Sequence, residues 1–228
     1  MSFKGYIKEN LPWIRSIYRK RLAPINLIHN IFDKPVVVLL YHRVNHLNRD
    51  LFNINVTPDN FERHIRILKN HYNVITFNDL KRNDIKEPSV IITFDDGYYD
   101  NYKYAFPILK KYQVPATIFI TSGGVDTGKE FWWDRLETVL FENKNLRESI
   151  ELDILNQRHI FDVSDDKKRL HSFYTLHHML FSLHPNERDM MLDRWYESYG
   201  LKDNPNNRTM TSSELIELYQ SQLVTLGA

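Results

Sequence analysis

Uninterrupted apolar runs of strand length, separated by helix-like stretches, constrain the fold of this chain more than any other feature. The runs are VVVLLY at 36–41, SVIITF at 89–94 and ATIFI at 116–120. Such runs are typical of strands buried on both faces of a parallel sheet. Residues 58–70, and the stretch between the second and third runs, repeat apolar residues with helical spacing. Strand, helix and strand in this order form a right-handed βαβ unit, so we predict an α/β fold with a parallel sheet.

The pattern changes after the third run. Residues 138–210 are expected to form a mostly helical insertion, which begins with a hairpin whose turn lies near residue 156. Amphipathic helices are expected to follow at 165–183 and 186–199. The insertion would therefore be built differently from the α/β part of the chain.

The last twenty residues return to the first pattern. Thr211 and Glu214 have the spacing of a capping box at the start of a helix. The run LVTLGA at 223–228 then predicts another short strand. Strand edges left unpaired at this point are unusual in a folded protein, so we expect residues 35–228 to form a partial domain.

Residues 1–34 are expected to form a separate basic helical segment. Its apolar positions lie on one helical stripe, with Lys and Arg residues behind them: Ile14, Ile17, Tyr18 and Leu22. The stripe fits a helix packed against the main domain, or a helix that contacts a membrane surface or a partner. We find no signal-peptide pattern and no transmembrane run, and expect a cytoplasmic protein that is peripheral to the membrane at most.

Charge and cysteine content exclude several kinds of site. Lys plus Arg number 30 and Asp plus Glu 29, so the formal net charge is +1. Proteins that bind nucleic acid usually concentrate basic charge, and we predict no such partner here. The sequence has no cysteine, so any metal must be bound through His, Asp or Glu side chains.

Two adjacent carboxylates, Asp95 and Asp96, follow the second apolar run in the sequence TFDDGY at 93–98. Active sites of parallel α/β folds lie beyond the carboxyl ends of the strands. Neighbouring carboxylates there point in different directions, so one is able to bind a metal while the other acts as a base. Asp-Asp-Gly is also common in turns and helix caps, and the motif alone leaves both roles open.

The surrounding motifs favour a catalytic role for Asp95 and Asp96 over a purely structural one. TFDDGY after a strand, LLYHRV at 39–44 and VPATIFITSG at 114–123 together resemble the polysaccharide deacetylase family, the NodB-homology family. The resemblance covers roughly residues 35–137, with a weaker echo in 209–228. FWWDRLE at 131–137 is similar to a bacterial subgroup associated with surface polysaccharides.

The resemblance implies the N-terminal part of a distorted (β/α) barrel that removes acetyl groups from N- or O-acetylated polysaccharide. Asp95 would be the general base, and Asp96 would bind a divalent metal, for which zinc is expected. The family's other two ligands come from a His-x-x-x-His motif after a strand like LVTLGA, and are expected beyond residue 228. We therefore expect the 228-residue chain to have little or no activity by itself.

Two segments supply candidate substrate-binding residues, one through the resemblance and one through its position near a strand end. Tyr41 and His42 end the first strand, where a Tyr-His pair recurs in the family and lines the site. Trp132, Trp133 and Asp134 follow a strand end and are expected to border the sugar pocket. Each of these residues fits a structural role as well: a hydrogen-bonded loop histidine, or packing where a strand meets a helix.

Other histidines are weaker candidates. A His42, His46 and Asp96 metal site is conceivable, but an i, i+4 pair converges on a helix and not in an extended segment. His171 and His178 share a helical face about 10 Å apart along the axis, too far to chelate one ion.

The leading hypothesis is a metal-dependent polysaccharide deacetylase. The alternative is a non-catalytic carbohydrate-binding or scaffolding domain of the same shape. Phosphoryl transfer through an aspartate would expect carboxylates at alternating positions, which the adjacent pair does not provide.

Overall fold

The computed structural model describes residues 35–81, 85, 87–154 and 157–228, so the predicted basic segment 1–34 lies outside the described residues. Parallel strands form the main sheet in the order β1 (Val36–Tyr41), β5 (Ser89–Phe94), β6 (Ala116–Phe119) and β9 (Val224–Gly227). The short strand β4 (Asn73–Val74) also pairs with β5.

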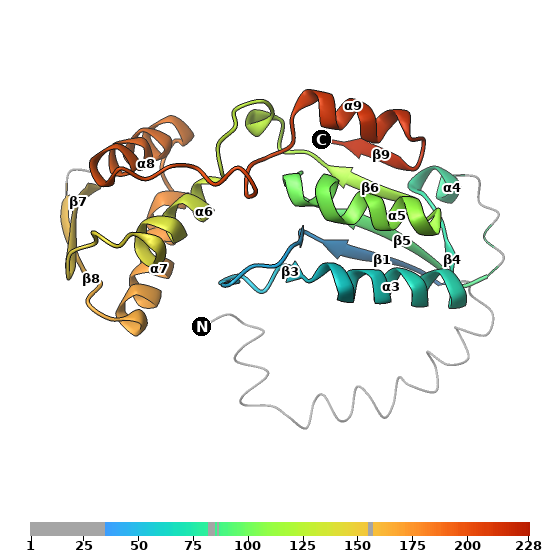
Figure 1. The fold of residues 1–228 in the computed structure, drawn as a ribbon, viewed down its shortest axis with the longest axis horizontal. Coiled ribbons are helices and arrows are strands. Elements are labelled where there is room, and N and C mark those ends of the chain that lie inside the picture. Colours follow the sequence, from blue (N-terminus) through green and yellow to red (C-terminus); the bar gives the residue numbers. More distant parts are fainter. Residues whose placement is uncertain (1–34, 82–84, 86, 155–156) are drawn as a thin grey trace, which may run out of the picture.

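Along β1, β5, β6 and β9 the strand order follows the chain, as in a singly wound (β/α) barrel and unlike a doubly wound sheet with a switch point. Strand β4 lies outside this path. The helices that accompany the sheet are α3 (Pro58–His71), α4 (Phe77–Lys81), α5 (Phe106–Tyr112) and α9 (Ser212–Gln220) (Figure 1). A π-helical segment, Asn101–Ala105, leads into α5. The predicted α/β fold with a parallel sheet is confirmed.

One face of the sheet carries the hydrophobic core. Alternate residues of β5, Val90, Ile92 and Phe94, pack with Phe61 of α3 and Leu109 of α5. Helix α9 begins with the predicted capping box, in which the Thr211 hydroxyl accepts from the Glu214 backbone and the Glu214 carboxylate accepts in return.

Strand β1 departs from the prediction of burial on both faces. Val38 and Leu40 are 49% and 56% exposed, whereas every residue of β5 is buried. The two runs look alike in sequence, but β5 lies between β1 and its other neighbours while β1 forms an edge of the sheet within the described residues. The position of each strand in the sheet therefore determines how much of it is buried.

The insertion forms a second group of elements beside the sheet (Figure 1). It contains α6 (Trp132–Glu137), a π-helical turn (Thr138–Glu142), the antiparallel hairpin of β7 (Ser149–Ile154) and β8 (Gln157–Asp162), and helices α7 (Asp166–Phe181) and α8 (Pro185–Tyr199). These elements share a hydrophobic cluster that already includes Trp132 and Leu136, before the predicted start at residue 138.

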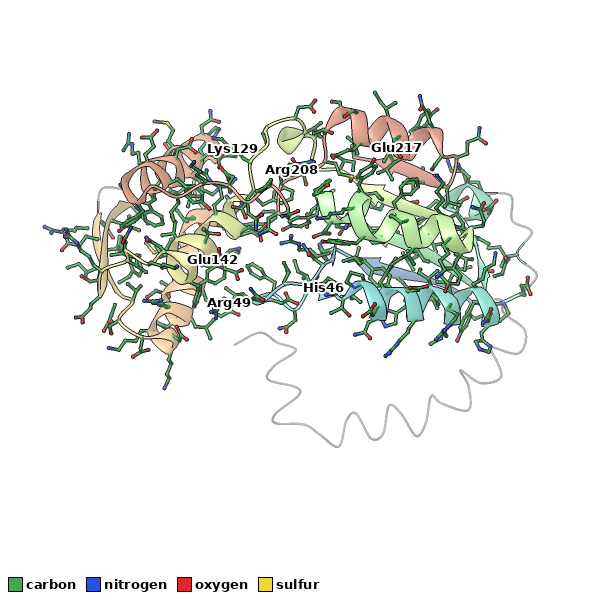
Figure 2. The ribbon with its side chains drawn as sticks, viewed as in Figure 1. His46, Arg49, Lys129, Glu142, Arg208 and Glu217 are labelled. Carbon is green, nitrogen blue, oxygen red and sulfur yellow. The ribbon has the colours of Figure 1, made fainter. Side chains whose placement is uncertain are left out.

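The chain returns from the insertion along the loop that follows β5. Thr209 pairs with Tyr98 in an antiparallel bridge, and the Met210 amide donates to the Gly97 carbonyl at 3.1 Å. The guanidinium of Arg208 lies over the Tyr99 ring at 3.9 Å, where the return segment meets the sheet (Figure 2). The insertion is thus tied directly to the segment that carries the twin carboxylates. A pair of two-residue strands, β2 (Arg43–Val44) and β3 (Asn55–Val56), lies at the same end.

Candidate functional site

The carboxylates of Asp95 and Asp96 lie at the carboxyl end of β5, as the sequence predicts. The Asp95 amide donates to the Tyr41 carbonyl at 2.9 Å, which continues the pairing of β1 with β5. Asp96 then turns the chain with a left-handed φ of 73°. Both aspartates are half-buried, so the fold holds their backbone firmly while their side chains keep access to solvent.

His42 reaches the same place from β1. Its Nδ1 lies 3.0 Å from Oδ2 of Asp96, and the two side chains are 28% and 23% exposed. His46 does not join them: its ring packs edge-on against Tyr104 at 6.2 Å. No group of at least three His, Asp or Glu side chains able to hold a metal ion occurs among the described residues. The structure therefore brings together His42 and Asp96, and leaves His46 outside the pair.

Gly97 makes the turn after the carboxylates possible. Its φ is +76°, and a Cβ built on it would lie 2.9 Å from Cδ1 of Ile120. Both the backbone conformation and the contact oppose any side chain at this position.

We expect Gly97→Ala to lower the free energy of unfolding by about 1–3 kcal/mol, through backbone strain and the clash. Urea denaturation measures the change. Gly123→Ala is the matched control, because an added Cβ there meets no atom within 4 Å. Equal stability of the two variants would contradict this explanation of the turn.

Beneath the carboxylates lies a buried ion pair that the sequence did not reveal. Nε of Arg43 donates to Asp100 at 2.9 Å, and the two side chains are 3% and 0% exposed. Asp100 also accepts from the Val44 amide at 3.1 Å and from Nδ2 of Asn45 at 3.2 Å. Nδ2 of Asn101 donates to the His42 carbonyl at 2.9 Å. This network fixes the segment that carries His42 against the helix that follows Asp96.

Asp134 belongs to an extension of this network. Its Oδ2 accepts from the hydroxyl of the fully buried Tyr98 at 2.9 Å, and Nε1 of Trp133 donates to the same hydroxyl at 2.7 Å. Oδ1 of Asp134 lies 3.5 Å from the Arg43 guanidinium. Asp134 and Trp133 thus connect the insertion to the TFDDGY loop, and their predicted contact with a sugar remains a prediction.

Burial raises the pKa of Asp134 to about 7, although the Arg43 guanidinium and the Tyr98 hydroxyl act in the opposite direction. A folded-state pKa above the ordinary value of 3.8 means that the folded protein binds this proton more tightly than the unfolded chain. The resulting stabilisation is present in full below about pH 4 and is lost as the pH rises to about 7.

We therefore expect Asp134→Asn to flatten the decrease in unfolding free energy between about pH 4 and pH 7. Urea denaturation at a series of pH values measures the slope. Burial also raises the pKa of Glu137 to about 7. Glu137 is unchanged in the variant, so its contribution to the pH dependence of stability remains. A slope identical to that of the unsubstituted protein would show that Asp134 does not titrate in this way.

The side chains of Tyr41 and Trp132 both pack against other aromatic rings. The Tyr41 ring packs between Phe61 and Phe94, at 5.1 and 5.5 Å, and its hydroxyl lies 3.2 Å from Nδ1 of His64 on α3. Side chains alternate along a strand, so Tyr41 faces the helices while its neighbour His42 faces Asp96.

Trp132 is 8% exposed in the core of the insertion. Its ring stacks on His177 at 4.7 Å, and the Arg188 guanidinium lies 4.6 Å from the ring centre. Contact of the Tyr41 or Trp132 side chain with a sugar remains a prediction.

Comparison with known proteins gives the following likenesses. The family model for polysaccharide deacetylase matches residues 82–145. The deacetylase homologue YxkH of Bacillus subtilis (strain 168) is 42% identical over 96 residues, covering 39% of this chain and 33% of that protein. The poly-beta-1,6-N-acetyl-D-glucosamine N-deacetylase of Staphylococcus aureus (strain MSSA476) is 36% identical over 110 residues, covering 41% of this chain and 38% of that protein.

Among solved structures, a de-N-acetylase from Aggregatibacter actinomycetemcomitans is 21% identical, with a TM-score of 0.44 over 84% of this chain and 53% of that one. The chain matches between 33% and 38% of the length of the two sequence relatives above.

Proposed function

We propose that this chain, whose residues 82–145 match the family model for polysaccharide deacetylase, takes part in removing acetyl groups from an N-acetylated polysaccharide. The observation that carries the proposal is the position of Asp95, Asp96 and His42 at the carboxyl ends of β5 and β1. Asp95 and Asp96 lie inside the matched region, and His42 contacts Asp96 from outside it. The named activity of the Staphylococcus aureus relative favours poly-N-acetylglucosamine as the substrate class.

Hydrolysis of an N-acetyl group requires a base close to the acetyl carbonyl. Water adds to the carbonyl carbon, the C–N bond breaks, and acetate and an amine are released. Asp95 is the proposed base that takes the proton from the attacking water, since a carboxylate at a half-exposed strand end is open to solvent. His42 holds the Asp96 carboxylate in place through the 3.0 Å contact.

Zinc is the ion that we propose for the complete site. Imidazole nitrogen and carboxylate oxygen are both zinc ligands, but catalytic zinc sites use three protein ligands. His42 and Asp96 supply two donors, and no group of three is found in the part of the chain that the structure describes. The residues present do not make a complete site, so we derive no step of the reaction through the ion.

Acetate release tests the proposal. The substrate is a β-1,6-linked N-acetylglucosamine pentamer, incubated with the chain and added zinc, with a chelator in a parallel sample. We expect weak release, because the described residues supply two metal donors, and we expect the chelator to abolish it. Release that persists in the chelator would contradict a metal-dependent activity, and binding of the pentamer with no release at any zinc concentration would favour the non-catalytic carbohydrate-binding alternative.

A membrane-surface contact through residues 1–34 and a cytoplasmic location remain predictions. None of the helices within the described residues is long and apolar enough to cross a bilayer. Co-sedimentation with liposomes, with and without residues 1–34, tests the surface contact. Equal binding by the two forms would contradict it.

A further inference from the structure

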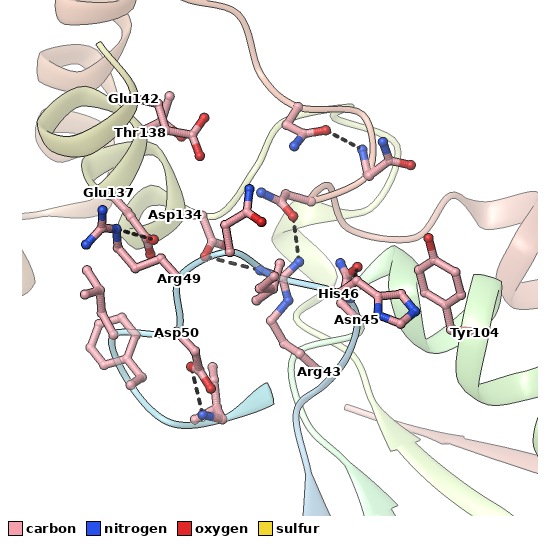
Figure 3. Close-up of a pocket in the computed structure, with 18 of the residues that line it drawn as sticks. Arg43, Asn45, His46, Arg49, Asp50, Tyr104, Asp134, Glu137, Thr138 and Glu142 are labelled. Atoms are coloured by element: carbon pink, nitrogen blue, oxygen red, sulfur yellow. Dashed lines mark hydrogen bonds and ion pairs between the residues drawn. The ribbon is translucent and has the colours of Figure 1, made fainter. Parts of the chain in front are cut away.

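A hollow lies between the segment after β1 and the insertion, and Asp95, Asp96 and His42 do not line it. Its volume is about 300 Å³, at the lower end of the range for ligand pockets. Its walls come from 43–54, 103–104, α6 with the turn that follows it, and 204–207 (Figure 3). Four separate parts of the chain thus converge on one cavity.

The charged groups of this cavity are largely paired with one another. Arg43 lies 3.5 Å from Asp134, and Nε of Arg49 lies 4.0 Å from Glu137. Asp50 accepts two hydrogen bonds from the backbone of its own loop, each at 3.0 Å. Because opposite charges line the walls together, the cavity does not select strongly for a cationic or an anionic ligand.

Other polar side chains in the walls are uncommitted, which here means that they form no hydrogen bond or ion pair with the described residues. In the described part of the chain, four lining side chains have no hydrogen-bond or ion-pair partner: His46, Asn48, Tyr104 and Glu142. His46 and Tyr104 lie at one end of the cavity and Glu142 at the other (Figure 3). Unused donors and acceptors therefore face the hollow from three segments.

We propose that this cavity binds a sugar residue of the polysaccharide, at a secondary site separate from the reaction centre. A sugar ring is neutral and carries several hydroxyl groups, which matches paired charges combined with free polar groups. The rings of Tyr104 and Phe52 also line the walls, where Tyr104 contacts His46 and Phe52 packs against Phe173. His42 and Arg43 are consecutive in an extended segment, so their side chains point to opposite sides, toward Asp96 and toward this cavity.

The identity of the sugar rests on the proposed function, so the test measures binding separately from turnover. The chain is titrated calorimetrically with the β-1,6-linked N-acetylglucosamine pentamer. The variants are Asn48→Ala and Tyr104→Phe, each of which removes one uncommitted polar group. Asn60→Ala, an exposed asparagine on α3, is the matched control.

We expect each cavity variant to raise the Kd by about threefold to tenfold, the usual effect of losing one hydrogen bond, while the control stays unchanged. Circular dichroism of each variant confirms that it is folded. Failure of the unsubstituted chain to bind the pentamer, or unchanged Kd values in both cavity variants, would overturn the inference. Binding that responds to these variants without any acetate release would support the cavity site and favour the non-catalytic carbohydrate-binding alternative for this chain.

Discussion

Asp100→Ala is expected to lower the free energy of unfolding by about 3–5 kcal/mol, because it leaves the Arg43 guanidinium buried without its closest carboxylate. Asp100 is fully buried and accepts from Arg43, the Val44 amide, Asn45 and Asn101. Asp134 lies 3.5 Å from the same guanidinium, which makes it a poor replacement for the 2.9 Å hydrogen bond of Asp100. Urea denaturation followed by tryptophan fluorescence measures the loss.

Two further variants make this result specific. Asp166→Ala removes an exposed aspartate from the first turn of α7 and is expected to cost less than about 1 kcal/mol. The double variant Arg43→Ala/Asp100→Ala is expected to lose less than the sum of the single losses, because each substitution removes the other's partner. Additive losses, or a loss below about 1 kcal/mol for Asp100→Ala, would show that the pair does not hold the two segments together.

Trp132→Ala is expected to cost a similar amount, about 3–5 kcal/mol, through the cavity it leaves in the core of the insertion. The side chain is 8% exposed and packs with His177, Trp133 and Arg188. This packing favours a structural role over the sugar contact predicted from sequence. Affinity for the N-acetylglucosamine pentamer should therefore stay unchanged under conditions where the variant is folded.

The matched control is Phe181→Ala. Phe181 is a large aromatic residue on α7 of the same insertion but is 72% exposed, so its removal should change stability by about 0.5 kcal/mol or less. If Trp132→Ala instead left stability intact and weakened pentamer binding, the original prediction of a sugar-binding tryptophan would be correct.

Local patterns in the sequence were sufficient for the strands and for the position of the carboxylates. The apolar runs became β1, β5, β6 and β9, and the spacing of Thr211 and Glu214 became a capping box. Asp95 and Asp96 lie at the strand end where the sequence placed them. These features depend on residues close together in the chain, which sequence periodicity reports directly.

Features that depend on distant residues were missed. Arg43 and Asp100 are separated by 57 positions and meet only because β1 pairs with β5. An arginine next to a strand end and an aspartate at a helix start look like ordinary exposed residues in sequence. The Tyr41-His42 pair shows the same limit, since strand alternation decides which of the two side chains faces Asp96.

The exposure of β1 has the same origin. Its run of valine and leucine matches β5 in composition, yet Val38 and Leu40 are half-exposed because β1 lies at an edge of the described sheet. Sequence patterns indicate that a strand is apolar, but its neighbours decide how much of it is buried.

Replacement of the proposed base tests the assignment of the site most directly. Acetate release from the N-acetylglucosamine pentamer is measured for the unsubstituted chain, for Asp95→Asn and for the exposed control Asp166→Asn, with zinc present throughout. We predict that Asp95→Asn lowers the rate by about 100-fold or more, as expected for loss of a general base, and that Asp166→Asn leaves it unchanged. Release by Asp95→Asn at the rate of the unsubstituted chain would contradict a role for the carboxylates after β5 in the reaction.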